Sequence, residues 1–386
     1  MIKNWIHKQR ILGSGFTKAE YQLYEFDKLE NPDDAMRYMS HRQNHGIYRP
    51  ALFSGNQQYF LDDKWITQVF FSSLNIPAPK TYGLFHPSFG VTISGKPYKN
   101  SVHIAESIAH ETPCRLVFKP RGGRKGQSVI IADATENNGS IYISVGGKKQ
   151  TIDEFISSLP QDAHSHYDGC YHGWLVQACI TQHEFLCHLN SDSVNSMRIV
   201  THIDSREDIQ IHFSMLRVGR TGSNVDNWDK GGLSIGIDPH TGILGRGISQ
   251  AAYGGSWTTE HPDSKVHFEG LQIPEWESIL EICRRGASLF SGVRSIGWDI
   301  ALTPTGPLII EGNADWGLPS VQVHTRGYLS EEVRCELDKF GAHFPKRARP
   351  ITLALLALLV YQWRRSKGPH ILHLLSKRII NLVRVV

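Results

Sequence analysis

Hydrophobic and polar residues are mixed along the first 60 positions in a pattern that predicts a helical lead-in. Residues 31–34 (Asn-Pro-Asp-Asp) form a break followed by a new helix start. Residues 61–71 then place apolar side chains at the spacing of a short amphipathic helix. The prolines at 77 and 79 end this helix, because proline lacks the N–H group that a helix needs and its ring clashes with the preceding turn.

Farther along the chain, short apolar runs predict strands. These runs are residues 115–119, 128–131, 174–179, 197–202, 209–218, 296–302 and 308–311. The first two flank a Gly-rich loop and predict a hairpin, whereas residues 274–290 predict a helix between later strands. Strand runs around isolated helices are typical of an α+β fold, in which two subdomains close over a cleft.

The C-terminal segment has a different pattern. Residues 351–360 are an unbroken apolar run, which is shorter than the roughly 20 residues of a membrane-spanning helix. Residues 371–386 are amphipathic, with Lys377, Arg378 and Arg384 away from the apolar face. Two interpretations stay open: attachment to an anionic membrane surface through residues 350–386, or a helix that packs on the body or on a second subunit of a homodimer.

Charge divides the chain unevenly. Of 41 Lys and Arg residues, nine lie from Lys346 onward, where there is no Asp or Glu. The first 345 residues therefore carry 32 basic and 37 acidic side chains. A mildly acidic body argues against nucleic acid as a partner, because such proteins carry a basic face. The 40% hydrophobic and 20% charged composition excludes large-scale disorder.

Six cysteines are scattered without CxxC pairs or the ligand spacing of a zinc site. Together with the lack of a recognisable signal peptide, they predict reduced thiols and a cytoplasmic location.

Residues 297–313 carry the most informative chemistry. A Pro/Gly turn joins two predicted strands, with Asp299 near the start of the first strand, and Glu311 and Asn313 near the end of the second. In an antiparallel hairpin these positions are neighbours, so two carboxylates and an amide oxygen converge. Apolar surroundings make unpaired charge costly, and Mg²⁺ prefers such oxygen ligands. The alternative is an ordinary hairpin with exposed acids.

Lys119 ends an apolar strand, and residues 120–128 follow as a basic, Gly-rich loop. Glycines let a backbone approach an anion closely, and a buried lysine needs an anionic partner, for which phosphate is well suited. The loop is neither a Walker A loop nor a dinucleotide fingerprint, because the GxxxxGK[ST] pattern is missing and no helix follows. Taken alone, it is equally compatible with a surface turn.

In their order along the chain, these motifs resemble the ATP-grasp superfamily, and closely its sugar-transfer-associated branch, which borders on α-L-glutamate ligase-like proteins. The resemblance runs from about Asp62 to Arg326. It rests on Asp63-Lys64, Ile76-Pro77-Ala78-Pro79, Lys119 with Gly122–Gln127, Leu175–Ile180, Asn195–Thr201, Val225–Gly232 and Gly297–Ile300, and on the triad Asp299, Glu311 and Asn313. The resemblance implies an α+β ATP-grasp fold in which two subdomains clamp a nucleotide. The expected parts are a helical lead-in (1–60), a catalytic region (61–345, with an adenine-side lobe at about 61–185 and a metal and substrate lobe at about 186–345) and a basic tail (346–386).

The resemblance also assigns roles to residues. Lys64, Lys119, Gly122, Gly123, Gln127, Gln177, Ala178, Ile180 and Glu184 would bind ATP, and Asp299, Glu311 and Asn313 would bind Mg²⁺, with Mn²⁺ as a substitute. Lys119, Arg198 and Arg217 would act in catalysis, with structural ion pairs as the alternative for the two arginines. Asn227, Lys230, Gly231 and Gly232 would face the substrate, with a plain surface loop as the alternative. The hinge position that usually holds a carboxylate is Gln177 here.

The implied activity is that of an ATP-dependent carboxylate–amine ligase working through an acyl phosphate, with a small-molecule or glycan-precursor carboxylate and an amine as substrates. Developing charge on the transferred phosphoryl group calls for positioned cations more than for an acid or a base. Two alternatives are a kinase that phosphorylates a hydroxyl, and a nucleotide-binding module that docks on a membrane without turnover.

Overall fold

The computed structural model describes residues 2–123, 128–160, 171–250 and 255–353. The chain divides into two compact units, one formed by residues 1–51 with 318–386 and the other by residues 52–317. Residues 318–345, which we expected in the catalytic region, thus group with the N-terminal helices. The apolar and amphipathic parts of the tail lie almost wholly outside the described residues.

The first unit is helical where it is described. It contains α1 (Ile2–Gly13), α2 (Lys18–Leu23), η1 (Phe26–Lys28), η2 (Pro32–Arg37), α3 (His41–Gln43), η3 (Asn44–Tyr48), most of α4 (Arg49–Leu52), α11 (Leu318–Gln322) and α12 (Glu331–Asp338). Buried Arg334 joins its two chain segments by donating to the carbonyl oxygens of Met36, Leu329 and Phe344. The predicted helical lead-in is therefore confirmed, although as several short helices.

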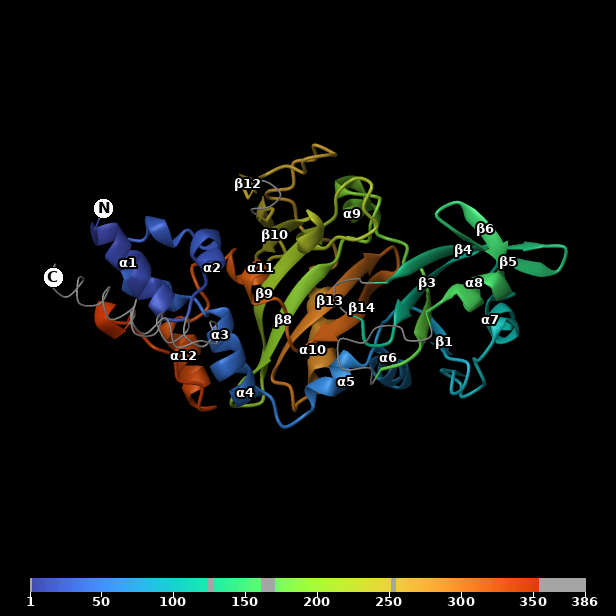
Figure 1. Cartoon of the computed structure of the whole chain (residues 1–386), viewed down its shortest axis with the longest axis horizontal. Coiled ribbons are helices and arrows are strands. Elements are labelled where there is room, and N and C mark those ends of the chain that lie inside the picture. Colours follow the sequence, from blue (N-terminus) through green and yellow to red (C-terminus); the bar gives the residue numbers. More distant parts are fainter. Residues whose placement is uncertain (1, 124–127, 161–170, 251–254, 354–386) are drawn as a thin grey trace, which may run out of the picture. The chain divides into compact units, whose positions relative to one another are not determined.

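The second unit contains two antiparallel sheets (Figure 1). The first has the strand order β2-β1-β7-β3-β4-β5-β6. Its strands are β1 (Thr81–Phe85), β2 (Val91–Thr92), β3 (Cys114–Pro120), β4 (Ile130–Asn137), β5 (Ser140–Val145), β6 (Lys148–Thr151) and β7 (Trp174–Ala178). Buried side chains of this sheet share a core with α7 (Ser101–Ile108) and α8 (Ile152–Ser158). The predicted β3–β4 hairpin is confirmed, with Phe118 paired to Ile130.

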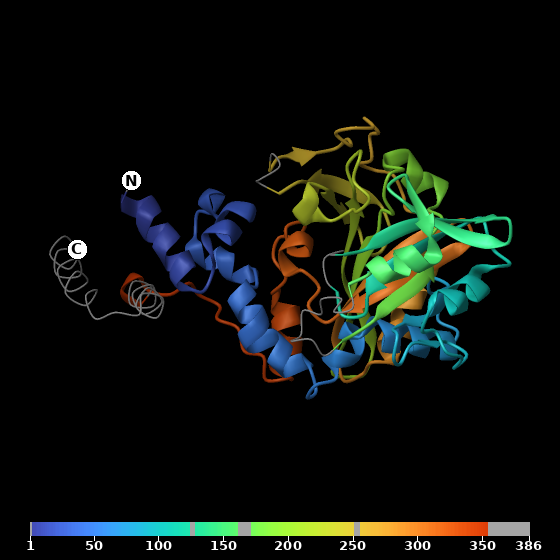
Figure 2. The ribbon, with the colours of Figure 1, turned by 45° about the vertical axis from the view of Figure 1, so that its right-hand side comes forward.

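The second sheet has the order β12-β11-β10-β9-β8-β13-β14. Its strands are β8 (Met197–Ile203), β9 (Ile209–Val218), β10 (Leu233–Ile237), β11 (Leu244–Ile248), β12 (Trp257–Thr258), β13 (Ser295–Thr303) and β14 (Gly306–Asn313). Helix α10 (Trp276–Ser288) packs across one face, where Trp298 is fully buried in the core. Figures 1 and 2 both show β13 and β14 (orange) on the side of this sheet nearer to the first sheet.

Shorter elements lie outside the strands: α5 (Gln58–Asp62) and α6 (Lys64–Ser73) precede β1, α9 (Glu184–Leu189) connects the two sheets between β7 and β8, and η4 (Trp228–Lys230) lies between β9 and β10. The apolar runs correctly predicted β3, β4, β7, β8, β9, β13, β14 and α10. Strands β1, β2, β6 and β10–β12 lie outside the predicted runs because they are short, polar or contain glycine, and their conformation depends on pairing with neighbouring strands. Strand β5 also lies outside those runs, although Ile141, Ile143 and Val145 alternate along it and are a usable strand signal.

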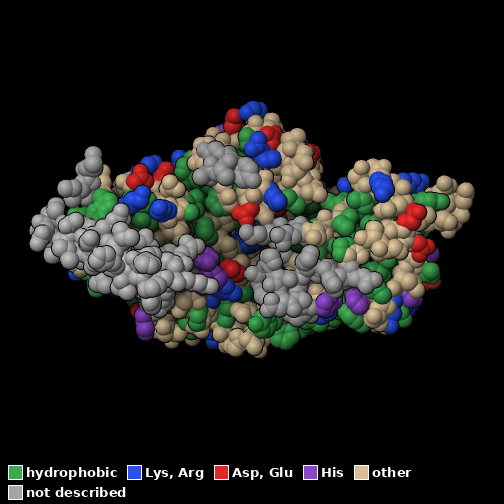
Figure 3. Space-filling model, viewed as in Figure 1, with side chains coloured by type: hydrophobic (Ala, Val, Ile, Leu, Met, Phe, Trp, Pro, Cys, Tyr) green, Lys and Arg blue, Asp and Glu red, His purple; other side chains and the backbone are tan. Residues whose placement is uncertain are grey.

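Among the described residues, no helix is long and apolar enough to cross a membrane. On the face drawn in Figure 3, basic and acidic side chains are scattered in small groups of both signs among the coloured atoms.

Two strand glycines offer a test of the packing. A Cβ atom at Gly297 of β13 would lie 2.2 Å from Cβ of Trp316, whereas one at Gly245 of β11 would meet only the Gly236 carbonyl oxygen at 3.7 Å. We expect Gly297→Ala to lower the free energy of unfolding by about 1–3 kcal/mol through overpacking, and Gly245→Ala to leave it within about 1 kcal/mol. Urea unfolding followed by tryptophan fluorescence measures both, and equal midpoints would contradict this account.

Candidate active site

The start of α6 is tied to the loop that follows β3. The Asp63 carboxylate accepts the N–H groups of Trp65 (3.1 Å) and Ile66 (3.3 Å), which caps the helix. The same carboxylate receives Nε (2.8 Å) and Nη2 (2.6 Å) of Arg121, and the Lys64 N–H donates to the Arg121 carbonyl oxygen at 3.1 Å. These contacts fix the start of α6 and therefore the position from which the Lys64 side chain projects.

The ammonium group of Lys64 contacts both the loop that follows β3 of the first sheet and strand β14 of the second sheet. It donates to the carbonyl oxygen of Gly123 at 2.5 Å and lies 3.3 Å from Oε2 of Glu311 on β14. Lys119, at the end of β3, is buried. Burial lowers the pKa of Lys119 to about 8, and neighbouring Lys64 adds to the lowering, while the carboxylates of Glu311 and Asp299 act against it. The two lysines predicted to bind phosphate therefore lie beside the predicted acids.

The predicted hairpin pairing of the acids is confirmed. Asp299 of β13 is the register partner of Glu311 of β14, and Gly297 is the partner of Asn313. Because directly paired residues project from the same face, the three polar side chains converge, with Nδ2 of Asn313 3.3 Å from Oε1 of Glu311. Burial would raise the pKa of Glu311, but the nearby cations, with Lys64 and Lys119 foremost, lower it to about 2.

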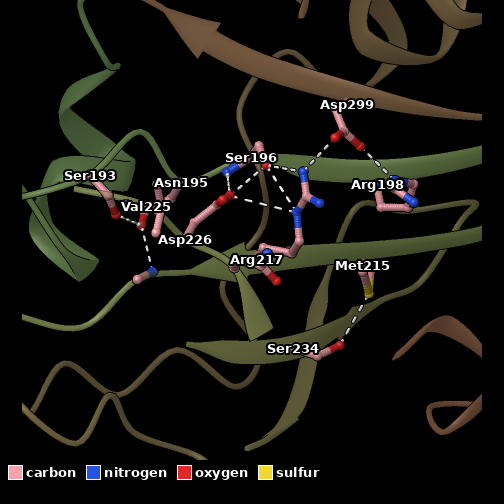
Figure 4. Close-up of polar contacts among 12 residues, drawn as sticks. Ser193, Asn195, Ser196, Arg198, Met215, Arg217, Val225, Asp226, Ser234 and Asp299 are labelled. Atoms are coloured by element: carbon pink, nitrogen blue, oxygen red, sulfur yellow. Dashed lines mark hydrogen bonds and ion pairs between the residues drawn. The ribbon is translucent and has the colours of Figure 1, made fainter. Parts of the chain in front are cut away.

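Two arginines meet at the Asp299 carboxylate (Figure 4). Arg198 of β8 donates from Nε to Oδ1 at 2.5 Å, and Nη2 of Arg217 on β9 lies 2.7 Å from Oδ2. Arg198 also donates to the Trp316 carbonyl oxygen. Burial lowers the pKa of Arg217, but the nearby carboxylates, with Asp299 foremost, raise it above its usual value. Both arginines thus form ion pairs and lie at the predicted phosphate site.

The residues gathered here suit an anion. Lys64, Lys119, Arg198 and Arg217 bring four positive charges, against three negative charges from Asp299, Glu311 and Asp226. A buried surplus of positive charge is unfavourable unless an anionic ligand compensates it.

The donor set of Asp299, Glu311 and Asn313 also fits a divalent cation. Two carboxylates and an amide oxygen on adjacent strands are hard oxygen ligands. Each carboxylate oxygen has a second lone pair besides the one directed at its present partner, which is an arginine for each oxygen of Asp299, and Lys64 or Asn313 for those of Glu311. The described residues contain no cluster of three or more His, Cys, Asp or Glu side chains that could hold a metal. An Asp–Glu–Asn set depends instead on the amide oxygen as its third ligand.

Of the residues predicted to bind the nucleotide, Gln177 and Ala178 end β7, Ile180 and Glu184 come after it, and the glycines follow β3. Gln177 is buried, and its Nε2 donates to Oγ1 of Thr81 on β1 at 2.8 Å. The N–H of Ala178 donates to the carbonyl oxygen of Lys80 at 2.9 Å, so this N–H already has a protein acceptor. Ile180 is half-buried in the connection to the second sheet, and Glu184 is exposed at the start of α9. Gly122 is buried beside Gly123, and Gln127 lies outside the described residues.

The predicted substrate residues lie in the loop between β9 and β10. Oδ1 of Asn227 accepts the Asp229 N–H at 3.0 Å and caps η4, and Lys230 is exposed. Gly231 has φ +92°, and a Cβ atom at Gly232 would lie 2.7 Å from the Asp226 carbonyl oxygen. Local backbone geometry therefore accounts for both glycines.

Ser196 and Asp226 have no role predicted from the sequence, although both lie within the motifs 195–201 and 225–232. Asp226 is the residue of segment 225–232 whose side chain reaches Arg217, with its Oδ2 3.6 Å from Nε. Its position directly before the Asn-Trp-Asp-Lys-Gly-Gly run is a sequence signal that could have marked Asp226 as a candidate site residue.

Comparison with known proteins agrees with this architecture. The family described as sugar-transfer associated ATP-grasp matches residues 43–335. The chain therefore belongs to the sugar-transfer associated ATP-grasp family. Its two sheets are the two lobes of an ATP-grasp fold, so the expected α+β class is confirmed. A comparison with the sequences of curated proteins finds no match.

Several solved structures are similar to the chain. D-alanine–D-alanine ligase from Bacillus anthracis is 12% identical, with a TM-score of 0.34 over 81% of this chain and 72% of that one. L-amino acid ligase from Bacillus licheniformis is 12% identical, with a TM-score of 0.38 over 76% and 52%. N5-carboxyaminoimidazole ribonucleotide synthetase from Thermotoga maritima is 11% identical, with a TM-score of 0.34 over 66% and 42%, so the chain spans less than half the length of that synthetase.

The lowered pKa of Lys119 makes nucleotide binding sensitive to pH. Bound phosphate stabilises the ammonium form, so ADP binding near pH 8 should take up a proton, and affinity should fall up to roughly tenfold per pH unit above pH 8. Calorimetry in buffers of different ionisation enthalpy measures this uptake. Lys119→Met should abolish it, whereas Lys148→Met, at an exposed position on β6, should not. Equal uptake in all three proteins would rule out Lys119 as its source.

Proposed function

We propose that this protein is an ATP- and Mg²⁺-dependent ligase that activates a substrate carboxylate as an acyl phosphate and joins it to an amine. The observation that carries the proposal is the meeting of Lys64 of α6 and Lys119 of the first sheet with the paired acids Asp299 and Glu311 of the second sheet. Family membership supports ATP as the phosphoryl donor.

In the proposed reaction, a carboxylate oxygen of the substrate attacks the γ-phosphorus of ATP, and the bond to the β-γ bridging oxygen breaks to release ADP. The amine then attacks the acyl carbon, inorganic phosphate leaves, and the amine loses a proton. Both steps place negative charge on phosphate oxygens, which Lys64, Lys119, Arg198 and Arg217 would stabilise from fixed positions. No residue needs to act as a nucleophile.

Asp299, Glu311 and Asn313 would hold the magnesium ion. When bound, the ion neutralises phosphate charge and orients the phosphates. The low pKa of Glu311 keeps this carboxylate ionised, as a metal ligand must be, throughout the neutral pH range.

Other residues would bind the rest of the nucleotide. The backbone around Ala178 and Ile180 would contact adenine beside Gln177, Glu184 would approach the ribose, and the loop containing Gly122, Gly123 and Gln127 would exclude water from the acyl phosphate.

The family description suggests the kind of substrate. An association with sugar transfer favours a carboxylate on a glycan precursor. If that precursor is lipid-linked, membrane-surface contact through residues 350–386 would bring enzyme and substrate together. This part of the proposal rests on the family's description rather than on side-chain geometry.

Replacing one acid tests the reaction. We expect Glu311→Gln to lower kcat/KM for ADP release at least about 100-fold, because it removes one charged oxygen ligand while keeping the side-chain volume. Glu136→Gln, at an exposed position on β4, should change the rate less than twofold.

Removing Mg²⁺ with a chelator should stop turnover, and Mn²⁺ should restore it in part.

An ADP-release screen against panels of carboxylates and amines decides the reaction type. A ligase releases phosphate only when both a carboxylate and an amine are present. Phosphorylation of a hydroxyl without an amine would identify a kinase, and ADP binding without turnover would identify a binding module.

A further inference from the structure

One partly buried carboxylate, Asp226, ties the loop between β9 and β10 to the phosphate site. Its Oδ2 accepts the N–H of Ser196 at 2.8 Å and the hydroxyl of Ser196 at 2.5 Å, and lies 3.6 Å from Nε of Arg217 (Figure 4). The side chain of Asp226 is 15% exposed and that of Arg217 is 17% exposed. Little solvent is therefore available to replace these contacts.

The guanidinium of Arg217 is held from two sides. Nη2 contacts Oδ2 of Asp299 at 2.7 Å, while Nε and Nη2 donate to the Ser196 hydroxyl at 3.1 and 2.7 Å. Since the hydroxyl hydrogen of Ser196 goes to Asp226, its oxygen lone pairs are turned toward Arg217. Asp226 thus acts on Arg217 both by charge and by orienting the serine.

The backbone holds Asp226 in place. A Cβ atom at Gly232 would lie 2.7 Å from the Asp226 carbonyl oxygen and 2.9 Å from that of Val218, so the two ends of the loop approach closely. The N–H of Gly219 donates to Oδ1 of Asn195 at 3.1 Å, which anchors the start of the loop beside β8. These contacts therefore hold in place the backbone from which the Asp226 side chain projects.

We propose that Asp226 is a positioning residue for phosphoryl transfer: with Ser196 it orients Arg217 toward the γ-phosphate site and couples the loop of residues 219–232 to Asp299. This inference rests on the proposed function. It gives the loop a role different from direct substrate contact by Asn227 or Lys230. An arginine held in advance loses less conformational entropy when phosphate binds and needs less reorganisation as charge develops.

The chain offers a matched control in Asp263, which lies outside the loop but forms an ion pair with Arg220 at the start of the loop. Arg220 and Asp263 form a bidentate ion pair, with both N–O distances 2.7 Å. Asp226→Asn and Asp263→Asn remove the same charge at nearly constant volume, but only the first should disturb Arg217. We expect Asp226→Asn to lower kcat about 10- to 100-fold with KM for ATP within about threefold, and Asp263→Asn to change kcat less than twofold.

A double-mutant cycle separates positioning from a general structural effect. If Asp226 acts through Arg217, then Arg217→Lys combined with Asp226→Asn should be no slower than the slower single variant within about twofold. Multiplicative losses would overturn the proposal. If Asp226→Asn does not fold, as judged by circular dichroism, the cycle uses Ser196→Ala, with Ser196→Thr expected to recover most of the rate.

Wild-type measurements distinguish the two levels of inference. A wild-type protein that neither binds ADP nor turns over ATP would refute the proposed function itself. An active wild-type protein for which Asp226→Asn and Asp263→Asn behave alike would refute only the positioning role of Asp226.

Discussion

The pairing of Asp299 with Glu311 across β13 and β14 is the interaction on which the rest of the site depends. Taking two carboxylates out of water costs several kcal/mol each unless cations compensate them. Here the compensation comes from Arg198 and Arg217 on strands β8 and β9, and from Lys64 on α6 and Lys119 on the first sheet. The negative charge of the two acids thus favours an arrangement in which basic residues that are distant in sequence lie close together.

The charge state of this site depends on whether an anionic ligand is bound. Lys119 is buried strongly enough that its pKa falls, while Glu311 keeps a low pKa in the same place. The two shifts have different causes: burial lowers the pKa of Lys119 even though Glu311 and Asp299 act against it, whereas the charges of Lys64 and Lys119 outweigh burial at Glu311. A bound triphosphate would place further negative charge beside Lys119, which fits the nucleotide chemistry of the ATP-grasp family.

The contacts around Arg217 extend the cluster beyond the phosphate site. An ion pair with Asp299 on one side and the Ser196–Asp226 contact on the other make one guanidinium part of both the acid pair and the β9–β10 loop. Asp226 lies outside any strand, so its effect depends on the tight glycine turn that closes the loop. Loop residues held by such geometry are common carriers of specificity on rigid scaffolds.

The sequence alone determined that residues 297–313 form a hairpin with Asp299 and Glu311 near one end, because two apolar runs flank a Pro/Gly turn. It also indicated the main strands, α10 and the ATP-grasp family. Only the structure decided the exact register, since an irregularity between Asp299 and Ile300 is what pairs Asp299 with Glu311 rather than with Ile310. Only the tertiary structure decided that Arg198 and Arg217 share Asp299, that Gln177 faces Thr81, and that Asp226 reaches Arg217. These contacts join residues far apart along the chain, and local sequence patterns carry no information about such distances; they follow from how sheets and loops pack.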